Sequence, residues 1–244
     1  MKDILISRLR MFAGPNGSGK STIKSLIKPK LLGLYVNPDD IEKEINQSGF
    51  LDLREFGIKT TQEEVQEFFN NSTLLEKANL IDETFYLRYN QDHLSFHDID
   101  TNSYWASVTA DFIRQKLLAL RASFTFETVM SSPDKIELLQ HAQRLGYRTY
   151  LYFVATEDPL INVSRVKQRV HFGGHNVPED KIISRYYRSL DLLMNAVKYS
   201  NRAYLFDNSG TNQVFLAEIT EGKTIETKQE PLPNWFKTYV LERL

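Results

Sequence analysis

The chain has 244 residues, 41% of them hydrophobic, and its 30 Lys and Arg nearly balance 31 Asp and Glu. This length fits one α/β domain with insertions, and the near-zero net charge disfavours nucleic acid and anionic membranes as partners. The absence of cysteine excludes disulfides and thiolate zinc sites. Because no apolar run approaches the roughly 20 residues of a membrane span and the N-terminus does not resemble a signal peptide, we expect a cytoplasmic protein.

The first predicted element is a short buried strand over Leu9–Ala13, which leads into the sequence GPNGSGKST. That sequence fills every position of the phosphate-loop pattern, and a helix over residues 21–28 follows it, as the pattern requires. Its glycines let N–H groups converge on phosphates, whereas a plain Gly-rich turn would need neither Lys20 nor Ser21. We expect ATP binding, with Lys20 on the β- and γ-phosphates and the Ser21 hydroxyl on Mg²⁺. The nucleotide-binding residues predicted here are Gly14, Pro15, Asn16, Gly17, Ser18, Gly19, Lys20, Ser21 and Thr22.

The next predicted strand, over Leu32–Asn37, ends in NPDDI, which is typical of a helix start. Asn37 would cap this helix and Pro38 would take its first position, so Asp39 and Asp40 fall in the first turn. Two interpretations are open: these carboxylates stabilise the helix dipole, or they act on a substrate.

A polar and aromatic region extends from Glu42 to about Tyr104. It contains His93 and His97, four residues apart, with acidic residues close by. This grouping suggests a metal site, but a surface loop is the favoured interpretation. We assign no metal beyond the Mg²⁺ carried by the nucleotide.

The rest of the chain alternates predicted strands and helices, which indicates a mostly parallel sheet flanked by helices, as in P-loop NTPases. The helix that begins after Ser132 is expected to be capped by that serine and closed by Gly146. A hairpin should follow the last parallel strand, and a closing helix should pack on the sheet edge. The expected helices cover residues 62–80, 106–120, 132–146, 158–170, 181–199 and 234–244, the strands residues 122–128, 147–156 and 202–210, and the hairpin residues 213–228.

Polar residues follow the predicted strands at the positions where open α/β sheets bind ligands. Glu127 lies in an otherwise apolar strand, where an unpaired charge is costly, so a functional role is favoured. Arginines are common on solvated helix surfaces, but four of them here lie on two helices joined by Gly173-Gly174-His175, which resemble a lid that closes over nucleotide phosphates. The candidates are Asp39, Asp40, Glu127, Thr128, Ser131, Ser132, Arg165, Arg169, Arg185 and Arg188.

Several segments together resemble the zeta toxin family of phosphate-loop kinases, and more narrowly its chromosomal zeta-like branch. They are GPNGSGKST, NPDDI, SFTFETVMSSPDKIELLQHAQRLGYRTYLYFVAT, RVKQRVHFGGHNVPEDKIISRYYRSLDLL and LFDNSG. The similarity covers most of residues 9–210. It implies a nucleotide-kinase-like fold and transfer of the ATP γ-phosphate to the 3′-hydroxyl of UDP-N-acetylglucosamine. An epsilon antitoxin restrains the plasmid-borne members, so the resemblance also implies a candidate antitoxin partner.

The same resemblance implies roles for individual residues. Lys20 matches the phosphate-loop lysine, and Asp39 matches the aspartate that deprotonates the sugar hydroxyl. Glu127 matches the substrate-binding glutamate after the third strand. Arg169 matches a lid arginine, with Arg165 as the alternative.

Two positions depart from the family pattern. Zeta toxins have an arginine four residues after the glutamate, where this chain has Ser131, and His175 stands near their second lid arginine. The resemblance therefore leaves Arg185 or Arg188 to supply the missing positive charge.

We expect a single P-loop kinase domain over residues 1–244, with an inserted substrate-side region at about 50–105, a lid at about 160–190 and a C-terminal hairpin and helix at about 211–244. The acceptor would be a small hydroxyl-bearing molecule, UDP-N-acetylglucosamine or a related sugar nucleotide. One alternative is a kinase acting on nucleic-acid or nucleoside hydroxyl groups, which would need a basic groove with stacking aromatics. Another is a non-catalytic ATP-dependent switch. Predicted catalytic residues are Lys20, Asp39 and Arg169; predicted substrate-binding residues are Asp39, Asp40, Glu127, Thr128 and Ser131; and Arg165 and Arg185 would join the phosphate loop in binding ATP.

Overall fold

The computed structural model describes residues 6–172 and 176–244, and the chain divides into two compact units. The first unit runs to Gly33 and resumes at Thr125, and the second comprises Leu34–Phe124. The predicted Gly173-Gly174-His175 segment lies outside the described residues.

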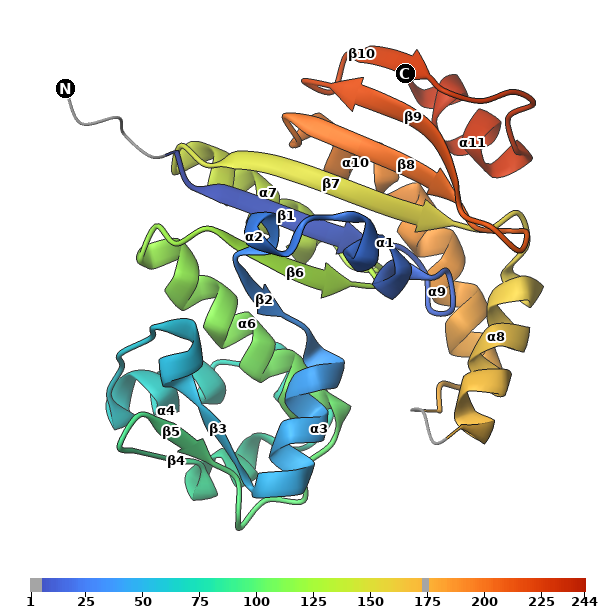
Figure 1. The fold of residues 1–244 in the computed structure, drawn as a ribbon. Helices are drawn as coiled ribbons and strands as arrows, with labels where there is room; N and C mark the ends of the chain where they lie inside the picture. Colours follow the sequence, from blue (N-terminus) through green and yellow to red (C-terminus); the bar gives the residue numbers. More distant parts are fainter. Residues whose placement is uncertain (1–5, 173–175) are drawn as a thin grey trace, which may run out of the picture. The chain divides into compact units, whose positions relative to one another are not determined.

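A mostly parallel sheet is the framework of the first unit (Figure 1). Its strands follow the order β10-β9-β8-β7-β1-β6, and β2 completes the seven-stranded sheet. Strand β7 pairs in parallel with both β1 and β8, whereas β9 and β10 pair antiparallel as a terminal hairpin. The strands are β1 (Arg8–Ala13), β2 (Leu34–Val36), β6 (Phe124–Thr128), β7 (Arg148–Ala155), β8 (Arg202–Asp207), β9 (Val214–Thr220) and β10 (Thr224–Thr227). The predicted α/β fold with a mostly parallel sheet is confirmed.

Helices of the first unit bury one face of this sheet, with α7 and α10 on the far side in Figure 1. The side chains on that face are aliphatic or aromatic and fully buried, as Met11, Leu151 and Leu205 illustrate. Burying such side chains supplies most of the stabilisation of a domain core. The helices are α1 (Lys20–Leu26), α2 (Pro29–Leu32), α7 (Asp134–Arg144), α8 (Pro159–His171), α9 (Glu179–Asp191), α10 (Leu193–Lys198) and α11 (Asn234–Tyr239), followed by the 3₁₀ turn η3 (Leu241–Arg243).

The second unit has a core of its own around stacked aromatic rings. Phe69 and Trp105 stack with ring centroids 6.1 Å apart, and Phe112 and Phe96 pack against them. The small antiparallel sheet in this unit has the order β3-β5-β4. The elements are α3 (Pro38–Ser48), β3 (Phe50–Asp52), η1 (Leu53–Phe56), α4 (Gln62–Asn70), α5 (Thr73–Lys77), η2 (Ile81–Tyr86), β4 (Arg88–Asn90), β5 (His93–Ser95) and α6 (Ser103–Ala119).

His93 contributes to this small sheet rather than to a cluster of metal ligands. It lies in β5, with Nδ1 2.7 Å from the Gln91 carbonyl oxygen and its ring packed edge-on against Phe50. Among residues 6–172 and 176–244, no three His, Asp or Glu side chains gather closely enough to hold a metal ion. In that same part of the chain, no helix has the length and apolar character needed to cross a membrane.

Three predicted helices differ from the observed ones. The predicted helix at 62–80 is split into α4 and α5, because the Ser72 hydroxyl caps a new helix by accepting from the Leu75 N–H at 3.3 Å. The predicted helix at 181–199 is interrupted at Leu192, which follows the last residue of α9 and precedes the first residue of α10. Ser132 does not cap α7, since the capping position is Pro133 and no side chain bonds there.

The predicted hairpin and closing helix both form, as β9, β10 and α11. However, α11 does not pack on the sheet edge. Trp235 lies against Phe153 of the central strand β7, with ring centroids 6.2 Å apart, and its indole N–H donates to Asp207 at 2.8 Å. The apolar ring is therefore buried on the sheet while its N–H is satisfied at the end of β8.

Candidate active site

The segment between β1 and α1 has the backbone of a phosphate-binding loop. Gly14, Gly17 and Gly19 have φ of +145°, +75° and +93°, in the region that side chains rarely adopt. A Cβ at Gly14 would lie 2.1 Å from the Val154 carbonyl oxygen. The three glycines thus let the loop lie against the end of β7 while the N-terminus of α1 points into the concavity, which is the arrangement that binds anions.

Lys20, the first residue of α1, has its ammonium group folded back over this loop. The residue is only 9% exposed, and Nζ donates to the carbonyl oxygens of Gly14 at 2.9 Å and Pro15 at 3.1 Å. Both of these acceptors are neutral carbonyl oxygens of the loop itself. A phosphate would be a stronger, charged acceptor for the same group.

Two asparagines far away in the sequence fasten the phosphate loop. Asn162 in α8 donates to the Asn16 carbonyl oxygen at 2.6 Å, and Asn208 after β8 donates to the Ser18 carbonyl oxygen at 2.8 Å. The Asn162 amide oxygen in turn accepts from the Thr156 hydroxyl. By occupying loop carbonyls, these amides favour a loop conformation in which its N–H groups face the concavity. Sequence analysis assigned no role to either asparagine: Asn208 lies in the LFDNSG segment that resembles the family, and Asn162 lies in no segment quoted for it.

The same contacts explain two of the glycines. A Cβ at Gly17 would lie 2.6 Å from the Asn162 carbonyl oxygen, and one at Gly19 would lie 2.2 Å from the Asn208 amide nitrogen. Both glycines are thus required by close approach as well as by backbone conformation.

The hydroxyl of Ser18 lies inside the loop and is buried. Within the described part of the chain it has no hydrogen-bond partner, and the same holds for the side-chain oxygen of Asn16. A buried polar group without a partner is costly. A phosphate or its bound water in the concavity would satisfy such groups, so the loop fits a nucleotide phosphate.

Arg165 joins α8 to the loop that carries Asn208. Its guanidinium donates to the Asn208 carbonyl oxygen at 2.6 Å and to the Gly210 carbonyl oxygen at 3.1 Å. In this structure Arg165 thus links α8 to the loop after β8, a link that we call the brace. Its contact with the nucleotide stays a prediction.

The other candidate arginines lie on α8 and α9, the helices predicted to form a lid. Arg169 is exposed in the last turn of α8, and Arg185 is half-buried in α9. Arg188 donates to the Ser184 hydroxyl at 3.1 Å on its own helix, an ordinary surface contact. The structure therefore gives Arg169 and Arg185 positions compatible with the predicted lid roles, which stay predictions.

Helices α8 and α9 pack on each other and are anchored at their base. Val163 and Val166 of α8 meet Ile182 of α9 in a small buried cluster. The Tyr186 hydroxyl donates to the Thr156 carbonyl oxygen at 2.5 Å, and the Ser189 hydroxyl donates to the Val129 carbonyl oxygen at 2.8 Å. Burial raises the pKa of the Tyr186 phenol well above its usual value, so this hydroxyl remains a donor. The helix pair is thus fixed to the ends of β6 and β7.

The polar residues after β6 lie where the sequence predicted. Glu127 and Thr128 are the last two residues of the strand and are half-buried, as is Ser131. The Thr128 hydroxyl accepts from the Met130 N–H at 3.0 Å and thereby shapes the turn. Glu127 is less buried than its apolar strand suggested, so it can meet a ligand without a large desolvation cost.

Asp39 and Asp40 begin α3 in the second unit. As predicted, Asn37 caps this helix, accepting from the Asp39 N–H at 3.2 Å, and Pro38 is its first residue. Both aspartates are exposed in the first turn. The predicted cap and helix start are therefore confirmed, while the roles of the two carboxylates stay predictions.

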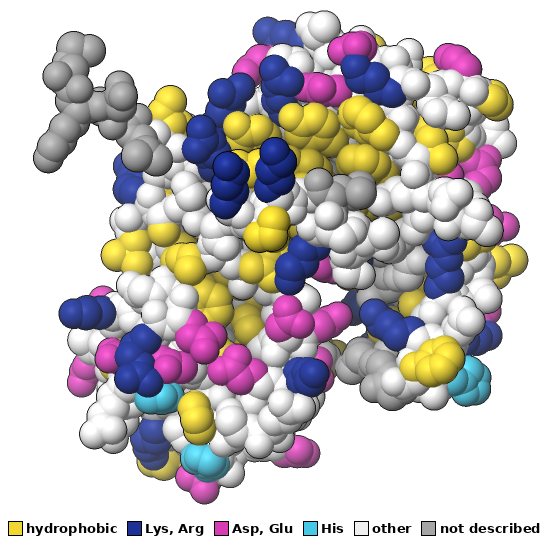
Figure 2. Space-filling view, in the orientation of Figure 1, with side chains coloured by type: hydrophobic (Ala, Val, Ile, Leu, Met, Phe, Trp, Pro, Cys, Tyr) yellow, Lys and Arg dark blue, Asp and Glu magenta, His cyan; other side chains and the backbone are white. Residues whose placement is uncertain are grey.

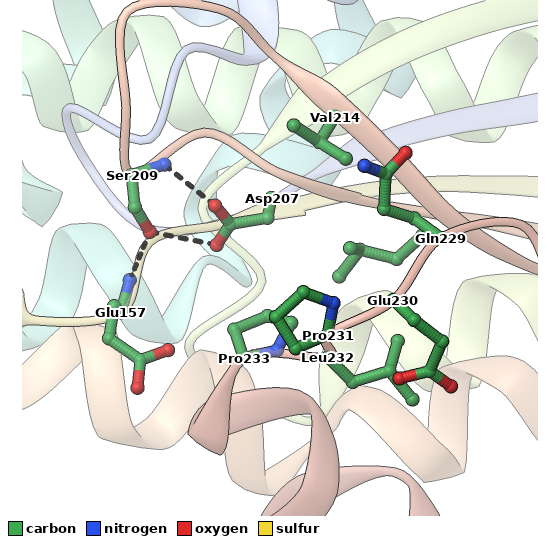
Figure 3. Close-up of a pocket in the computed structure, with 10 residues that line it drawn as sticks. Glu157, Asp207, Ser209, Val214, Gln229, Glu230, Pro231, Leu232 and Pro233 are labelled. Carbon is green, nitrogen blue, oxygen red and sulfur yellow. Dashed lines mark hydrogen bonds between the residues drawn. The ribbon is translucent and has the colours of Figure 1, made fainter.

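A pocket of about 350 Å³ lies beside the loop that follows β8 (Figure 3). Asp207 points to this loop and accepts from the Ser209 N–H at 3.0 Å and from the Ser209 hydroxyl at 2.8 Å. The Ser209 hydroxyl oxygen accepts from the Glu157 N–H at 2.7 Å. These bonds fix the turn that presents Asn208 and the Gly210 carbonyl, so Asp207 supports the phosphate loop indirectly.

The hydrogen bond from Asn208 to the phosphate loop leads to a first prediction. Asn208→Ala removes the donor to the Ser18 carbonyl, a bond expected to contribute about 1 kcal/mol, so the KM for ATP should rise about fivefold to tenfold with little change in kcat. Steady-state kinetics and thermal unfolding should be measured together. Asn201→Ala is the control, since Asn201 accepts from the Thr149 N–H at 2.8 Å at the opposite end of β7. The control should lower Tm without changing KM; an equal KM change in both variants would contradict the prediction.

Comparison with known proteins places the chain in a family. Residues 99–220 match the family model described as zeta toxin, which is half of the 244 residues. The chain belongs to the zeta toxin family. The matched range includes β6, the lid helices and the Asn208 segment, whereas the phosphate loop precedes it.

Individual relatives of this zeta toxin family member are distant. An uncharacterized protein of Haemophilus influenzae is 32% identical over 63 residues, which are 26% of this chain and 45% of that protein. A crystal structure of AvrRxo1-ORF1:AvrRxo1-ORF2 with sulphate ions matches 93% of this chain with a TM-score of 0.55 and 15% identity. A crystal structure of AvrRxo1-ORF1:-ORF2 with ATP matches with a TM-score of 0.51 and 15% identity, again over 93% of the chain. The chain spans 62% of each solved chain and about half of the curated relative, so these likenesses establish the fold.

Proposed function

We propose that this zeta toxin family member is an ATP-dependent kinase that transfers the γ-phosphate to a hydroxyl of a small acceptor, UDP-N-acetylglucosamine or a related sugar nucleotide. The observation that carries the proposal is the phosphate loop, with its three positive-φ glycines, the buried Lys20 at its mouth and the α1 N-terminus behind it. ATP is supported by the related fold solved with ATP. The acceptor class rests on family membership.

Each part of a phosphoryl-transfer site has a candidate residue. Phosphoryl transfer depends mainly on positioning and on stabilising charge. Lys20 would bind the β- and γ-phosphates, and the Ser21 hydroxyl would hold Mg²⁺, which neutralises charge on those phosphates when bound. Arg169 would stabilise the transferring group. The residues proposed to bind the acceptor are Asp39, Asp40, Glu127, Thr128 and Ser131, with Asp39 as the base.

We also propose a protein partner that restrains the kinase. The similar solved structure is a complex of two named components, AvrRxo1-ORF1 and AvrRxo1-ORF2, and zeta toxins are held by antitoxins. A chain that consumes a wall precursor would need such a restraint in its host. Co-purification with the product of a neighbouring reading frame is the direct check.

The acceptor is tested by a transfer assay with γ-labelled ATP. Purified protein is incubated with Mg²⁺ and, separately, with UDP-N-acetylglucosamine, other UDP-sugars, nucleosides and 5′-hydroxyl oligonucleotides, and products are identified by mass spectrometry. We expect label on a UDP-sugar. Label on an oligonucleotide or nucleoside would instead support a kinase that acts on nucleic-acid or nucleoside hydroxyl groups. Slow ATP hydrolysis whose rate no acceptor changes would support an ATP-dependent switch.

The neighbours Asp39 and Asp40 provide a matched pair for the base. Successive helical side chains point about 100° apart, so only one can readily face an acceptor hydroxyl. Asp39→Asn should bind ATP normally but lose transfer by roughly 10²-fold or more, the scale of a general base. Asp40→Asn should keep most activity, while each change costs about 0.3–1 kcal/mol of stability through the helix dipole. Single-turnover transfer and ATP affinity decide between them: equal small losses would leave two helix-start carboxylates and no base.

A further inference from the structure

The two faces of the main sheet differ in burial. On one face, residues such as Leu9, Leu151 and Leu205 are fully buried beneath helices. On the other, Tyr150, Tyr152, Tyr204 and Phe215 are only partly buried, and Arg148 is exposed. Figure 2 shows hydrophobic side chains at the surface over β7 and β8, with Lys and Arg side chains along their border. We call the second face, formed by Arg8, Arg10, Arg148, Tyr150, Tyr152, Arg202, Tyr204 and Phe215, the open face.

Strand register brings the residues of the open face together. Arg8 is the cross-strand partner of Arg148, and Arg10 is the partner of Tyr150. Tyr150 in turn is the partner of Arg202, and Tyr152 is the partner of Tyr204. Two arginines directly opposite each other are unfavourable in an isolated sheet. Their juxtaposition concentrates positive charge on this part of the face.

The aromatic rings of the open face are already engaged with their neighbours. Tyr152 and Tyr204 stack on each other with centroids 4.9 Å apart and planes at 24°. The guanidinium groups of Arg10 and Arg148 lie 5.1 and 5.8 Å from the centroid of the Tyr150 ring. The rings are thus held in place by each other and by arginines, and the exposed Arg148 is the arginine beside them at the surface.

The tyrosine hydroxyls of the open face remain hydrogen-bond donors. Burial raises the pKa of Tyr152 to about 12, with the neighbouring Tyr204 adding to the effect, and burial also raises the pKa of Tyr204. Both phenols stay protonated at neutral pH. The face therefore offers apolar area together with donors of two kinds, and the carboxylate opposite Tyr204, that of Glu218, is paired with Arg202.

Part of this face is covered, since Phe12, the cross-strand partner of Tyr152, is fully buried. Over β7 and β8, however, Figure 1 shows no helix on the near side of the sheet, although strands of parallel sheets normally have helices on both sides. An exposed apolar area bordered by charge commonly marks a binding surface. We infer that the open face binds an amphipathic, acidic helix of a partner protein, which completes the missing helical layer. Its apolar side would lie on the tyrosines and Phe215, and its carboxylates would face Arg8 and Arg148, since Arg202 is already paired with Glu218.

Two other occupants fit less well. A second copy of the chain would bring arginines toward arginines, because the acidic side chains farther across this face are already paired: Glu218 with Arg202 and Glu226 with Lys228. Single-stranded nucleic acid binds such sheets by stacking bases on free ring faces, and the rings here stack on each other instead. Charge and ring geometry both favour the acidic helix.

The inference is tested with a synthetic amphipathic peptide of about 20 residues, long enough to form a helix, with Leu on one side and Glu beside it. A second peptide carries Lys in place of every Glu. Binding of each fluorescent peptide to the full chain is measured by anisotropy, and cross-linking with mass spectrometry locates it. We expect the Glu peptide to bind at least about tenfold more tightly than the Lys peptide, with cross-links in β7 or β8 and weaker binding at high salt.

Charge-reversal variants of the protein complete the test. Arg148→Glu should weaken binding of the Glu peptide at least about tenfold. Lys237→Glu is the control, because it reverses a charge at an exposed position of α11, which packs against the opposite face of the sheet. It should leave binding of the Glu peptide unchanged. Lys20→Ala should bind the peptide normally, so a failed kinase proposal would not affect this result. Equal binding of both peptides, cross-links elsewhere, tighter binding of oligo-dT, or a dimer in light scattering that Arg148→Glu dissociates would each overturn the inference.

Discussion

Lys20→Ala is expected to reduce phosphoryl transfer below detection. Lys20 is the only residue of the phosphate-loop motif that brings a full positive charge to the β- and γ-phosphates, and phosphoryl transfer depends on such charge. The structure holds its ammonium group at the mouth of the loop, 2.9 Å from the Gly14 carbonyl oxygen. Transfer should be measured on protein shown to be folded by circular dichroism, with ATP affinity determined in parallel.

Lys24→Ala is the matched control for this experiment, because it removes the same charge from the same helix one turn later. We expect it to retain activity within a few-fold. Lys20 also donates to two loop carbonyls, so its loss should loosen the loop and lower ATP affinity as well. Near wild-type turnover by folded Lys20→Ala protein would end the phosphate-loop interpretation.

How much of this site was predictable depends on how far apart its residues lie in the chain. The phosphate loop is a contiguous pattern whose glycines, lysine and helix start all lie within nine residues, so the sequence predicted it completely. The asparagines that fasten it are 146 and 190 residues from their partners. Such contacts follow from how β7, β8 and α8 are placed in the fold, and no local pattern encodes that placement.

The errors in the predicted elements have local causes. The split between α4 and α5 depends on one serine hydroxyl that competes for a backbone N–H, and the split after α9 has no Gly or Pro to mark it. The closing helix was assigned to the sheet edge because its position at the end of the chain suggested it. Trp235 instead lies at the centre of the sheet, where its ring packs against Phe153 and its N–H donates to Asp207.

The open face could not be predicted from the sequence either. Alternation in β7, with Tyr150 and Tyr152 between buried residues, is compatible with a strand covered on both sides or on one. Strand order and register were needed to show that arginines and tyrosines from β1, β7 and β8 share one face.

Arg169→Ala is expected to lower kcat by about 10³-fold, the scale set by arginines that stabilise a transferring phosphoryl group. Arg165 and Arg169 are four residues apart and share one side of α8. Since Arg165 braces the Asn208 and Gly210 carbonyls beside the phosphate loop, Arg169 lies one turn farther out on the same side. There it is exposed, on the helix pair that we propose as a lid, and it makes neither of the two hydrogen bonds of Arg165.

Arg165→Ala provides the contrast that decides the alignment of the lid. Its loss removes two hydrogen bonds, worth about 1–3 kcal/mol together, so it should lower Tm and raise the KM for ATP while kcat changes by less than about tenfold. Both variants should be measured by steady-state and single-turnover kinetics, because a group that acts on the transition state lowers kcat, whereas a positioning group alters KM. If Arg165→Ala lowers kcat more than Arg169→Ala does, the lid acts through the arginine one helical turn nearer the phosphate loop, and Arg165 would have to leave its carbonyl partners when the nucleotide binds.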